Sequence, residues 1–158
     1  MDEITIGVLL DPDIEYGIGV LEGVREYARH FPAWRVLPLG QAQEGLLVRL
    51  ARTGELRGLI GTIISDRWFG GRLAALPTVN TSNLSHVTAV SSVVPDDEAA
   101  GRLVARHFCD LNVPAAGVVA DRATYAARLR REGFLTEMQS RGVPVSEPPE
   151  NDAFRPEA

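Results

Sequence analysis

The sequence predicts an α/β protein built on a doubly wound, parallel β-sheet. Several short segments rich in Val, Ile and Leu lack polar alternation, which is typical of strands buried on both faces of a parallel sheet. Segments with apolar residues at helical spacing lie between them. Alternating strands and helices favour parallel pairing through right-handed crossovers.

The first part of the chain alternates regularly between the two kinds of segment. The strands predicted here are Ile4–Leu10, Trp34–Leu39, Gly58–Ile64, Pro77–Thr81 and Val87–Val90. The helices predicted here are Ile14–Phe31, Leu46–Ala51 and a short helix or turn at Trp68–Leu76. Pro32 ends the first helix. Pro38 cannot donate to a β-ladder, so we expect the second strand near a sheet edge.

The second part begins with a helix that Asp96 is placed to cap, with acidic residues in its first turn. This helix is predicted to run through Leu111, followed by a strand at Ala116–Ala120. A further helix is predicted at Tyr125–Arg141, ended by Gly142. The acidic, proline-rich tail Ser146–Ala158 is interpreted as disordered or as a linker.

The composition argues against several classes of function. The net charge is −5, all 16 basic residues are arginine, and they are scattered rather than clustered, which disfavours nucleic-acid binding by this chain. A lone Cys109 and three widely spaced histidines give no metal-site spacing. No Gly-x-Ser-x-Gly elbow occurs, and a Gly-Lys phosphate loop is impossible without lysine. We therefore expect no enzyme activity, cofactor or metal.

The start of the chain and its apolar segments bear on location. Met1–Glu3 is acidic, whereas a signal peptide begins with positive charge and has a longer apolar core. No apolar run approaches membrane-spanning length. We expect a cytoplasmic protein with no membrane association.

Polar residues follow three of the predicted strands, at Asp11–Asp13, Ser65–Asp66 and Thr81–Asn83. Ligands of doubly wound sheets bind beyond the carboxyl ends of the strands, and Asp, Asn and Ser suit hydrogen bonding to hydroxyl groups. The same residue types also make ordinary turns, and that alternative is the stronger one for any single loop.

Two segments go beyond a general α/β pattern. Val94–Phe108, VPDDEAAGRLVARHF, resembles the part of lactose-repressor-like sensor domains in which an Asp follows a valine-rich strand and starts an alanine- and glycine-containing helix. Arg130–Phe134, RREGF, resembles the Arg-x-x-Gly-aromatic signature of the second lobe in that family. The spacing between the two segments fits as well.

The first helix narrows the resemblance. Tyr16 and the segment Val20–Tyr27, VLEGVREY, look like the start of the AraC-family xylose operon regulator, which places its sensor first and its helix-turn-helix domains last. The first strand at Ile4, without a preceding headpiece, agrees with that order.

The resemblance implies the first lobe of a type I periplasmic-binding-protein-like fold, with only the start of a second lobe. The implied organisation is an N-terminal sensing lobe over 1–113, an opening strand and helix over 114–145, and the tail over 146–158. The implied function is sugar sensing in a bacterial transcriptional regulator, through ligand-induced cleft closure. The implied partners are a small-molecule effector, a second copy in a homodimer, and DNA through a domain absent from this chain.

The residues selected as ligand-binding combine the strand exits with the two motifs. They are Asp11, Asp13, Tyr16, Ser65, Asp66, Asn83, Asp96 and Arg130. Asp96 is equally consistent with a helix cap. Arg130 is more consistent with a solvated face, since Arg122, Arg128 and Arg131 lie near it in sequence. The alternative function is a single flavodoxin-like lobe that dimerises without binding a small molecule.

Overall fold

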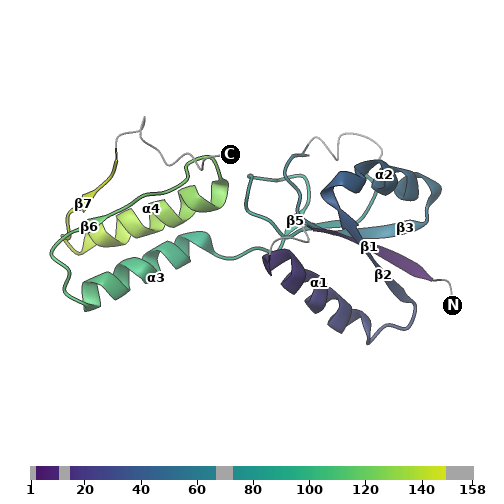
Figure 1. The fold of residues 1–158 in the computed structure, drawn as a ribbon, viewed down its shortest axis with the longest axis horizontal. Helices are drawn as coiled ribbons and strands as arrows, with labels where there is room; N and C mark the ends of the chain where they lie inside the picture. The colour runs from purple at the N-terminus through teal and green to yellow at the C-terminus, as the bar shows by residue number, and fades with distance from the viewer. Residues whose placement is uncertain (1–2, 11–14, 67–72, 149–158) are drawn as a thin grey trace. The chain divides into compact units, whose positions relative to one another are not determined.

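The computed structural model describes residues 3–10, 15–66 and 73–148 (Figure 1). The chain forms two compact units. The first contains residues 1–82 and 86–94, and the second contains residues 83–85 and 95–158. Each unit is described separately below.

The first unit is a five-stranded sheet in the order β2-β1-β3-β4-β5, with every neighbouring pair parallel. The strands are β1 (Ile4–Leu10), β2 (Trp34–Gly40), β3 (Leu56–Gly61), β4 (Thr78–Asn80) and β5 (Ser91–Ser92). This order is that of a doubly wound, flavodoxin-like sheet. The predicted edge position of the strand containing Pro38 is confirmed, because β2 ends the strand order and, among the described strands, pairs with β1 alone.

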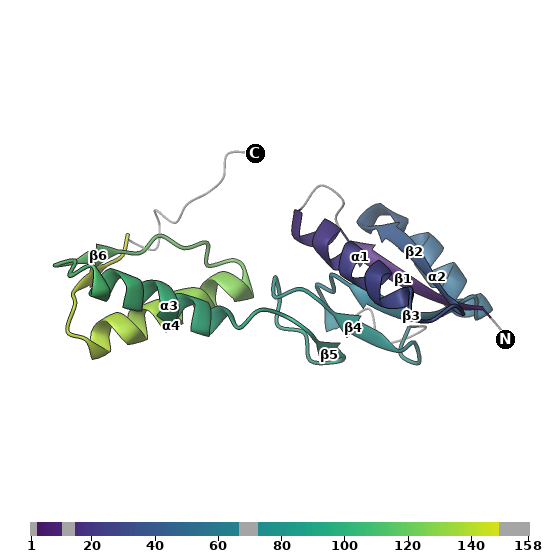
Figure 2. The same cartoon turned by 90° about the horizontal axis from the view of Figure 1, so that it is seen from below.

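Two helices connect the first three strands, α1 (Glu15–Ala28) and α2 (Glu44–Thr53). A short 3-10 turn at Gln41–Gln43 precedes α2, and Gly54 ends it with a φ of 74°. The β1-to-β2 and β2-to-β3 connections run in opposite directions across the sheet. Right-handed crossovers therefore place α1 and α2 on opposite faces of the sheet (Figures 1 and 2).

The main core lies on the face covered by α2. Its buried members are Leu9, Leu39, Leu47, Leu56, Leu59, Ile63 and Leu73. These side chains come from three adjacent strands, from the segment that follows β3, from α2 and from the turn at Leu73. Each fully buried leucine contributes about 1.5–3 kcal/mol, so this cluster stabilises the packing of α2 on the sheet.

The predicted strand at Val87–Val90 is wrong, since the fifth strand is the shorter segment Ser91–Ser92. Asp66 supplies the physical reason. Its carboxylate Oδ1 accepts the N–H groups of Thr88 and Ala89, both at 3.0 Å. Those two donors are therefore engaged by a side chain and do not join a β-ladder.

The second unit contains α3 (Asp97–Asp110), β6 (Ala116–Gly117), α4 (Tyr125–Ser140) and β7 (Val145–Ser146). The strands β6 and β7 pair in parallel, so β6, α4 and β7 form a further β-α-β connection. Both predicted helices of this part are confirmed, and so is the end at Gly142, with a φ of 71°. The predicted strand Ala116–Ala120 forms a ladder only over its first two residues.

Helix α3 packs side by side with α4 (Figures 1 and 2). Ala105 of α3 and Phe134 and Met138 of α4 are the buried members of their shared core. The boundary between the units therefore falls at Val94 and Pro95, whereas the sequence placed α3 with the first lobe and the boundary at Val113. The reason is that the apolar face of α3 is covered by α4.

Two further predictions concern ends of segments. Ser146 belongs to β7, and Glu147 binds Arg131 through its carboxylate, so the start of the predicted tail is part of the second unit. Residues 149–158 lie outside the described residues, as do Asp11, Asp13 and Trp68. Of the predicted helix or turn Trp68–Leu76, Leu73–Leu76 is described and forms a turn.

Candidate functional site

The centre of the polar site in the second unit is Asp97, the first residue of α3. Its side chain is only 1% exposed. Arg130 of α4 donates from Nε to Oδ1 of Asp97 at 2.7 Å, and Asn83 donates from Nδ2 to Oδ2 at 2.8 Å. Both carboxylate oxygens are thus held by side chains from other segments, which offsets the cost of burying the charge.

Asn83 connects this carboxylate to the start of α4. Its backbone carbonyl accepts the N–H of Ala126 at 2.8 Å, and the carbonyl of Leu84 accepts the N–H of Tyr125 at 3.0 Å. The first N–H groups of a helix have no partner within the helix. The short segment 83–85 therefore caps α4, while the Asn83 side chain reaches α3.

Asp96 caps α3, as the sequence predicted. Its Oδ1 accepts the N–H of Ala99 at 2.8 Å. At the start of α4, the side-chain hydroxyl of Thr124 accepts the N–H of Ala127 at 3.3 Å. Both helix starts are thus fixed by side-chain caps, each of which contributes about 1 kcal/mol.

Two glycines set the spacing between the helices that carry the site. A Cβ at Gly101 would overlap the backbone carbonyl of Arg130, and a Cβ at Gly133 would overlap the backbone carbonyl of Glu98. The backbone of the opposite helix therefore packs directly against each glycine, one helical turn away from Asp97 on α3 and from Arg130 on α4. This close approach places Arg130 within hydrogen-bonding distance of Asp97.

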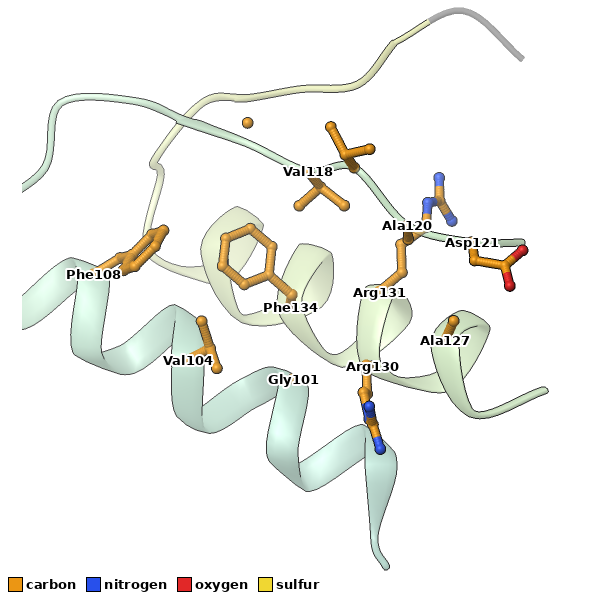
Figure 3. A pocket seen from close by; sticks show the side chains of 12 residues that line it. Gly101, Val104, Phe108, Val118, Ala120, Asp121, Ala127, Arg130, Arg131 and Phe134 are labelled. Atoms are coloured by element: carbon orange, nitrogen blue, oxygen red, sulfur yellow. The ribbon is translucent and has the colours of Figure 1, made fainter. Parts of the chain in front are cut away.

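A pocket of about 420 Å³ opens between α3, α4 and the segment that follows β6 (Figure 3). Val104, Val118 and Phe134 point into it from three different elements. Asp121 and Arg131 lie at its polar end. The pocket thus combines an apolar wall with a small number of charged groups, the composition that small-molecule sites commonly have.

Arg131 is held on the other side by Glu147. It donates from Nη2 to Oε1 at 2.8 Å, and Arg122 lies 3.3 Å from Oε2 of the same carboxylate. Arg131 lowers the pKa of Glu147 mainly by this hydrogen bond, against the opposing effect of desolvation.

The carboxyl edge of the sheet in the first unit is organised by Asn80, which is buried at the end of β4. Its Oδ1 accepts the N–H groups of Ile63 at 3.1 Å and Ser82 at 3.0 Å. Its Nδ2 donates to the Ser82 carbonyl at 2.8 Å and to Oγ of Ser92 at 3.1 Å. One amide therefore joins the ends of β3, β4 and β5.

Tyr16 lies at the same edge, in the first turn of α1. Its hydroxyl donates to the carbonyl of Thr81 at 2.8 Å, and the residue is 47% exposed. The hydrogen bond fixes the ring while leaving part of its surface open to solvent. An aromatic face held in this way is able to pack on the C–H surface of a sugar ring.

Asp66 follows β3 and faces the loop 86–90. Besides the two N–H groups, it accepts the hydroxyl of Thr88 at 3.1 Å. The N–H of Ala89 is the largest cause that lowers the pKa of Asp66. The observed contacts of Asp66 thus hold a loop, and its neighbour Ser65 is half-buried.

The structure brings together two of the eight predicted ligand residues, because Asn83 and Arg130 meet at Asp97. A solvated face was the favoured alternative for Arg130, and the structure shows that it forms an ion pair with Asp97 while its side chain remains 59% exposed. Tyr16, Asp66 and Asp96 each have other partners. Their roles in ligand binding stay predictions.

Sequence reasoning missed Asp97 and Asn80. A signal for Asp97 was present, since Asp97, Gly101 and Ala105 follow one another at a spacing of four and all three are buried on α3. Asn80 gave no such signal, because an asparagine at a strand end is ordinary turn chemistry.

The chemistry available at this site is hydrogen-bond donation from the guanidinium of Arg130 to a polar ligand. Arg130 has five N–H donors, of which Nε is used by Asp97. Across residues 3–10, 15–66 and 73–148, no group of three His, Cys, Asp or Glu side chains is placed to hold a metal ion. The described helices include none that is long and apolar enough to cross a membrane.

No family model and no curated protein matches the sequence. Solved structures do match by fold. One is a periplasmic binding protein/LacI transcriptional regulator from Alkaliphilus metalliredigens QYMF complexed with D-xylulofuranose, with 17% identity, a TM-score of 0.70, and coverage of 96% of this chain and 58% of that chain. Another is a LacI transcriptional regulator from a Rhodococcus species, with 18% identity, a TM-score of 0.72, and coverage of 90% and 56%.

A third is a carbohydrate transporter solute-binding protein from Chloroflexus aurantiacus in complex with D-glucose, with 18% identity, a TM-score of 0.70, and coverage of 93% and 48%. The chain thus spans about half the length of these structures. At such identities the likeness establishes the fold alone. The chain has the type I periplasmic-binding-protein-like α/β fold, with the doubly wound sheet of its first lobe and the start of a second lobe.

Proposed function

We propose that this chain is the cytoplasmic sugar-sensing effector domain of a bacterial transcriptional regulator, arranged as in the AraC-family xylose operon regulator. It binds a sugar, signals by ligand-induced cleft closure, and acts on DNA through a domain outside this chain. It has no enzymatic activity of its own, and the regulator works as a homodimer.

The observation that carries this proposal is the arrangement of Arg130, Asp97 and Asn83. Asp97 holds Arg130 through Nε, and among the described residues no other side chain engages the two terminal nitrogens of the guanidinium, which are thus available to a ligand. Two adjacent hydroxyls match the fork of a guanidinium. Supporting the choice of ligand, the fold neighbours from Alkaliphilus metalliredigens and Chloroflexus aurantiacus hold D-xylulofuranose and D-glucose.

Calorimetric titration with a panel of pentoses and hexoses tests the proposal. We expect saturable binding of at least one sugar, weakened about tenfold or more by Arg130→Ala, because a lost hydrogen bond to a charged group costs about 1.5–3 kcal/mol. Arg128→Ala is the matched control, since Arg128 also lies on α4 but donates to the carbonyl of Arg122. If the wild-type chain binds none of the sugars in the panel, the result counts against sugar sensing.

Closure has a separate readout. Small-angle scattering is expected to give a smaller radius of gyration with the bound sugar than without it. Binding with an unchanged radius would support a sugar-binding module that signals in another way.

A further inference from the structure

An apolar stripe runs along the side of α3 that faces away from the rest of the second unit. It consists of Ala100, Leu103 and His107 of α3 and its C-cap residue Leu111, which share one face at 3.6 residues per turn. All four are exposed, Leu103 by 68% and Leu111 by 61%. Ala105, on the opposite face, is buried against α4. The four residues do not line the pocket of Figure 3, so the stripe is separate from that pocket.

Two charged residues, Arg106 and Asp110, lie along one flank of this stripe. Arg106 donates from Nε and Nη2 to the carboxylate of Glu137 at 3.1 and 3.3 Å, and Arg141 donates to the same carboxylate at 2.9 Å. Two arginines thus share one carboxylate, which leaves one positive charge in excess. Asp110 is exposed, and its carboxylate has no partner among the described residues. As the last residue of α3, it also lies at the negative end of the helix dipole, which is unfavourable.

We propose that this stripe is the interface of the homodimer, in which α3 of two copies packs antiparallel about a two-fold axis at His107. The inference rests on the homodimer of the proposed function and names the surface that forms it. The axis lies at His107 because Leu103 and Leu111 are four positions before and after it. Both copies use the same surface in a two-fold pair, so Leu103 of one copy covers Leu111 of the other.

The charges favour the antiparallel direction. In the antiparallel pair, the flanks that carry Arg106 and Asp110 lie on the same side of the interface. Arg106 is then offset from Asp110 of the second copy by only about 3 Å along the helix axis. The second copy thus supplies a carboxylate to the arginines that share Glu137, and opposite charges across an interface fix its register. In a parallel pair, this flank would face the flank that carries Val104, and Asp110 would gain no partner.

Two single helices make a small interface. Helix α3 has 14 residues, and a pair of such helices buries less than the roughly 1,600 Å² of a standard interface. We therefore expect a weak dimer, whose fraction rises with protein concentration. Sedimentation velocity on the whole chain measures its dissociation constant.

Leu103→Asp is expected to weaken the dimer about tenfold or more, because each of the two new carboxylates would lie against Leu111 of the other copy. Ile18→Asp is the matched control, since Ile18 is an exposed apolar residue of α1 in the first unit. It should leave the dissociation constant unchanged. Asp110→Asn should weaken the dimer about threefold, because it removes two exposed ion pairs.

Disulfide trapping in a Cys109→Ser background tests the direction and the register. Position 107 lies on the two-fold axis, so the His107→Cys variant should cross-link to a second copy of itself on oxidation. The Leu103→Cys variant should not, since the two positions 103 lie about 12 Å apart along the axis. It should cross-link to the Leu111→Cys variant when the two are mixed.

Three results would overturn the proposal. The first is a dimer that Leu103→Asp leaves intact or that Ile18→Asp weakens, which would keep the homodimer but place its interface elsewhere. The second is self-cross-linking of Leu103→Cys, which would mean a parallel pair. The third is a monomer at millimolar concentration, which would remove the homodimer as well. Sugar binding is measured separately by the calorimetric titration, so sugar sensing can stand or fail independently of this interface.

Discussion

Gly101 of α3 lies directly against the backbone carbonyl of Arg130 in α4, so closely that no side chain fits between the two helices. The two residues belong to the two motifs that the sequence singled out, separated along the chain by the whole β6 strand and its loops. Gly133 repeats the relationship in the opposite direction, against the carbonyl of Glu98. The motifs are therefore two halves of one helix crossing, and that crossing holds Arg130 at Asp97.

Gly101→Ala is expected to destabilise the second unit by about 1–3 kcal/mol, because the added methyl group has to push α4 away. Urea denaturation followed by circular dichroism measures the change. Gly19→Ala is the control, because its Cβ would meet nothing within 4 Å, and it should stabilise α1 by about 0.5–1 kcal/mol. Equal stability of Gly101→Ala and the wild type would contradict the close crossing.

Asn80→Ala is expected to reduce the stability of the first unit by about 2–4 kcal/mol. The N–H groups of Ile63 and Ser82 lose their acceptor, and a buried donor without a partner costs about 1–3 kcal/mol. Ser91→Ala, at an exposed position of β5, should stay within about 0.5 kcal/mol of the wild type. Denaturation midpoints that coincide for the two variants would argue against Asn80 as the organiser of this edge.

Asp66→Ala is expected to release the loop 86–90 without unfolding the sheet. The N–H groups of Thr88 and Ala89 lose their acceptor, so their hydrogen exchange should become faster. The same acceleration should appear in the wild type as the pH falls. The pKa of Asp66 is lower in the folded state than in the unfolded state. The ionised Asp66 therefore stabilises the loop fully above the unfolded pKa, and this stabilisation is lost as the pH falls through the folded pKa. Exchange rates of Thr88 and Ala89 that change neither in Asp66→Ala nor at low pH would contradict this role of Asp66.

Acid should loosen the second unit through Glu137 and Glu147. Hydrogen bonds from Arg106 and Arg141 lower the pKa of Glu137, and those from Arg131 and Arg122 lower the pKa of Glu147. Because both folded pKa values are lowered, stability is lost as the pH falls through them. The double variant Glu137→Gln and Glu147→Gln should show a flatter dependence of unfolding free energy on pH than the wild type. Glu132→Gln, an exposed α4 position, should keep the wild-type slope.

Local signals in the sequence were enough for most of the fold. Unbroken apolar segments predicted β1 and β3, and Pro38 predicted the edge position of β2. Asp96 predicted the start of α3, and Gly142 predicted the end of α4. Each of these features depends on residues that are near one another in the sequence. The prediction of a strand at Val87–Val90 was wrong because Asp66 accepts the N–H groups of Thr88 and Ala89. These two residues lie 22 and 23 positions after Asp66 in the chain. Apolar pattern carries no information about such a distant acceptor.

In the candidate site, too, some features follow from the sequence and others only from the tertiary structure. The sequence by itself determined the class of fold, the starts of α3 and α4, and two of the residues that meet in the second unit, Asn83 and Arg130. Only the tertiary structure showed that the residue between them is Asp97 rather than Asp96, and that α3 belongs with α4. The physical reason is that burial and side-chain pairing arise where two helices cross, and the glycines that allow this crossing lie 32 residues apart, at 101 and 133.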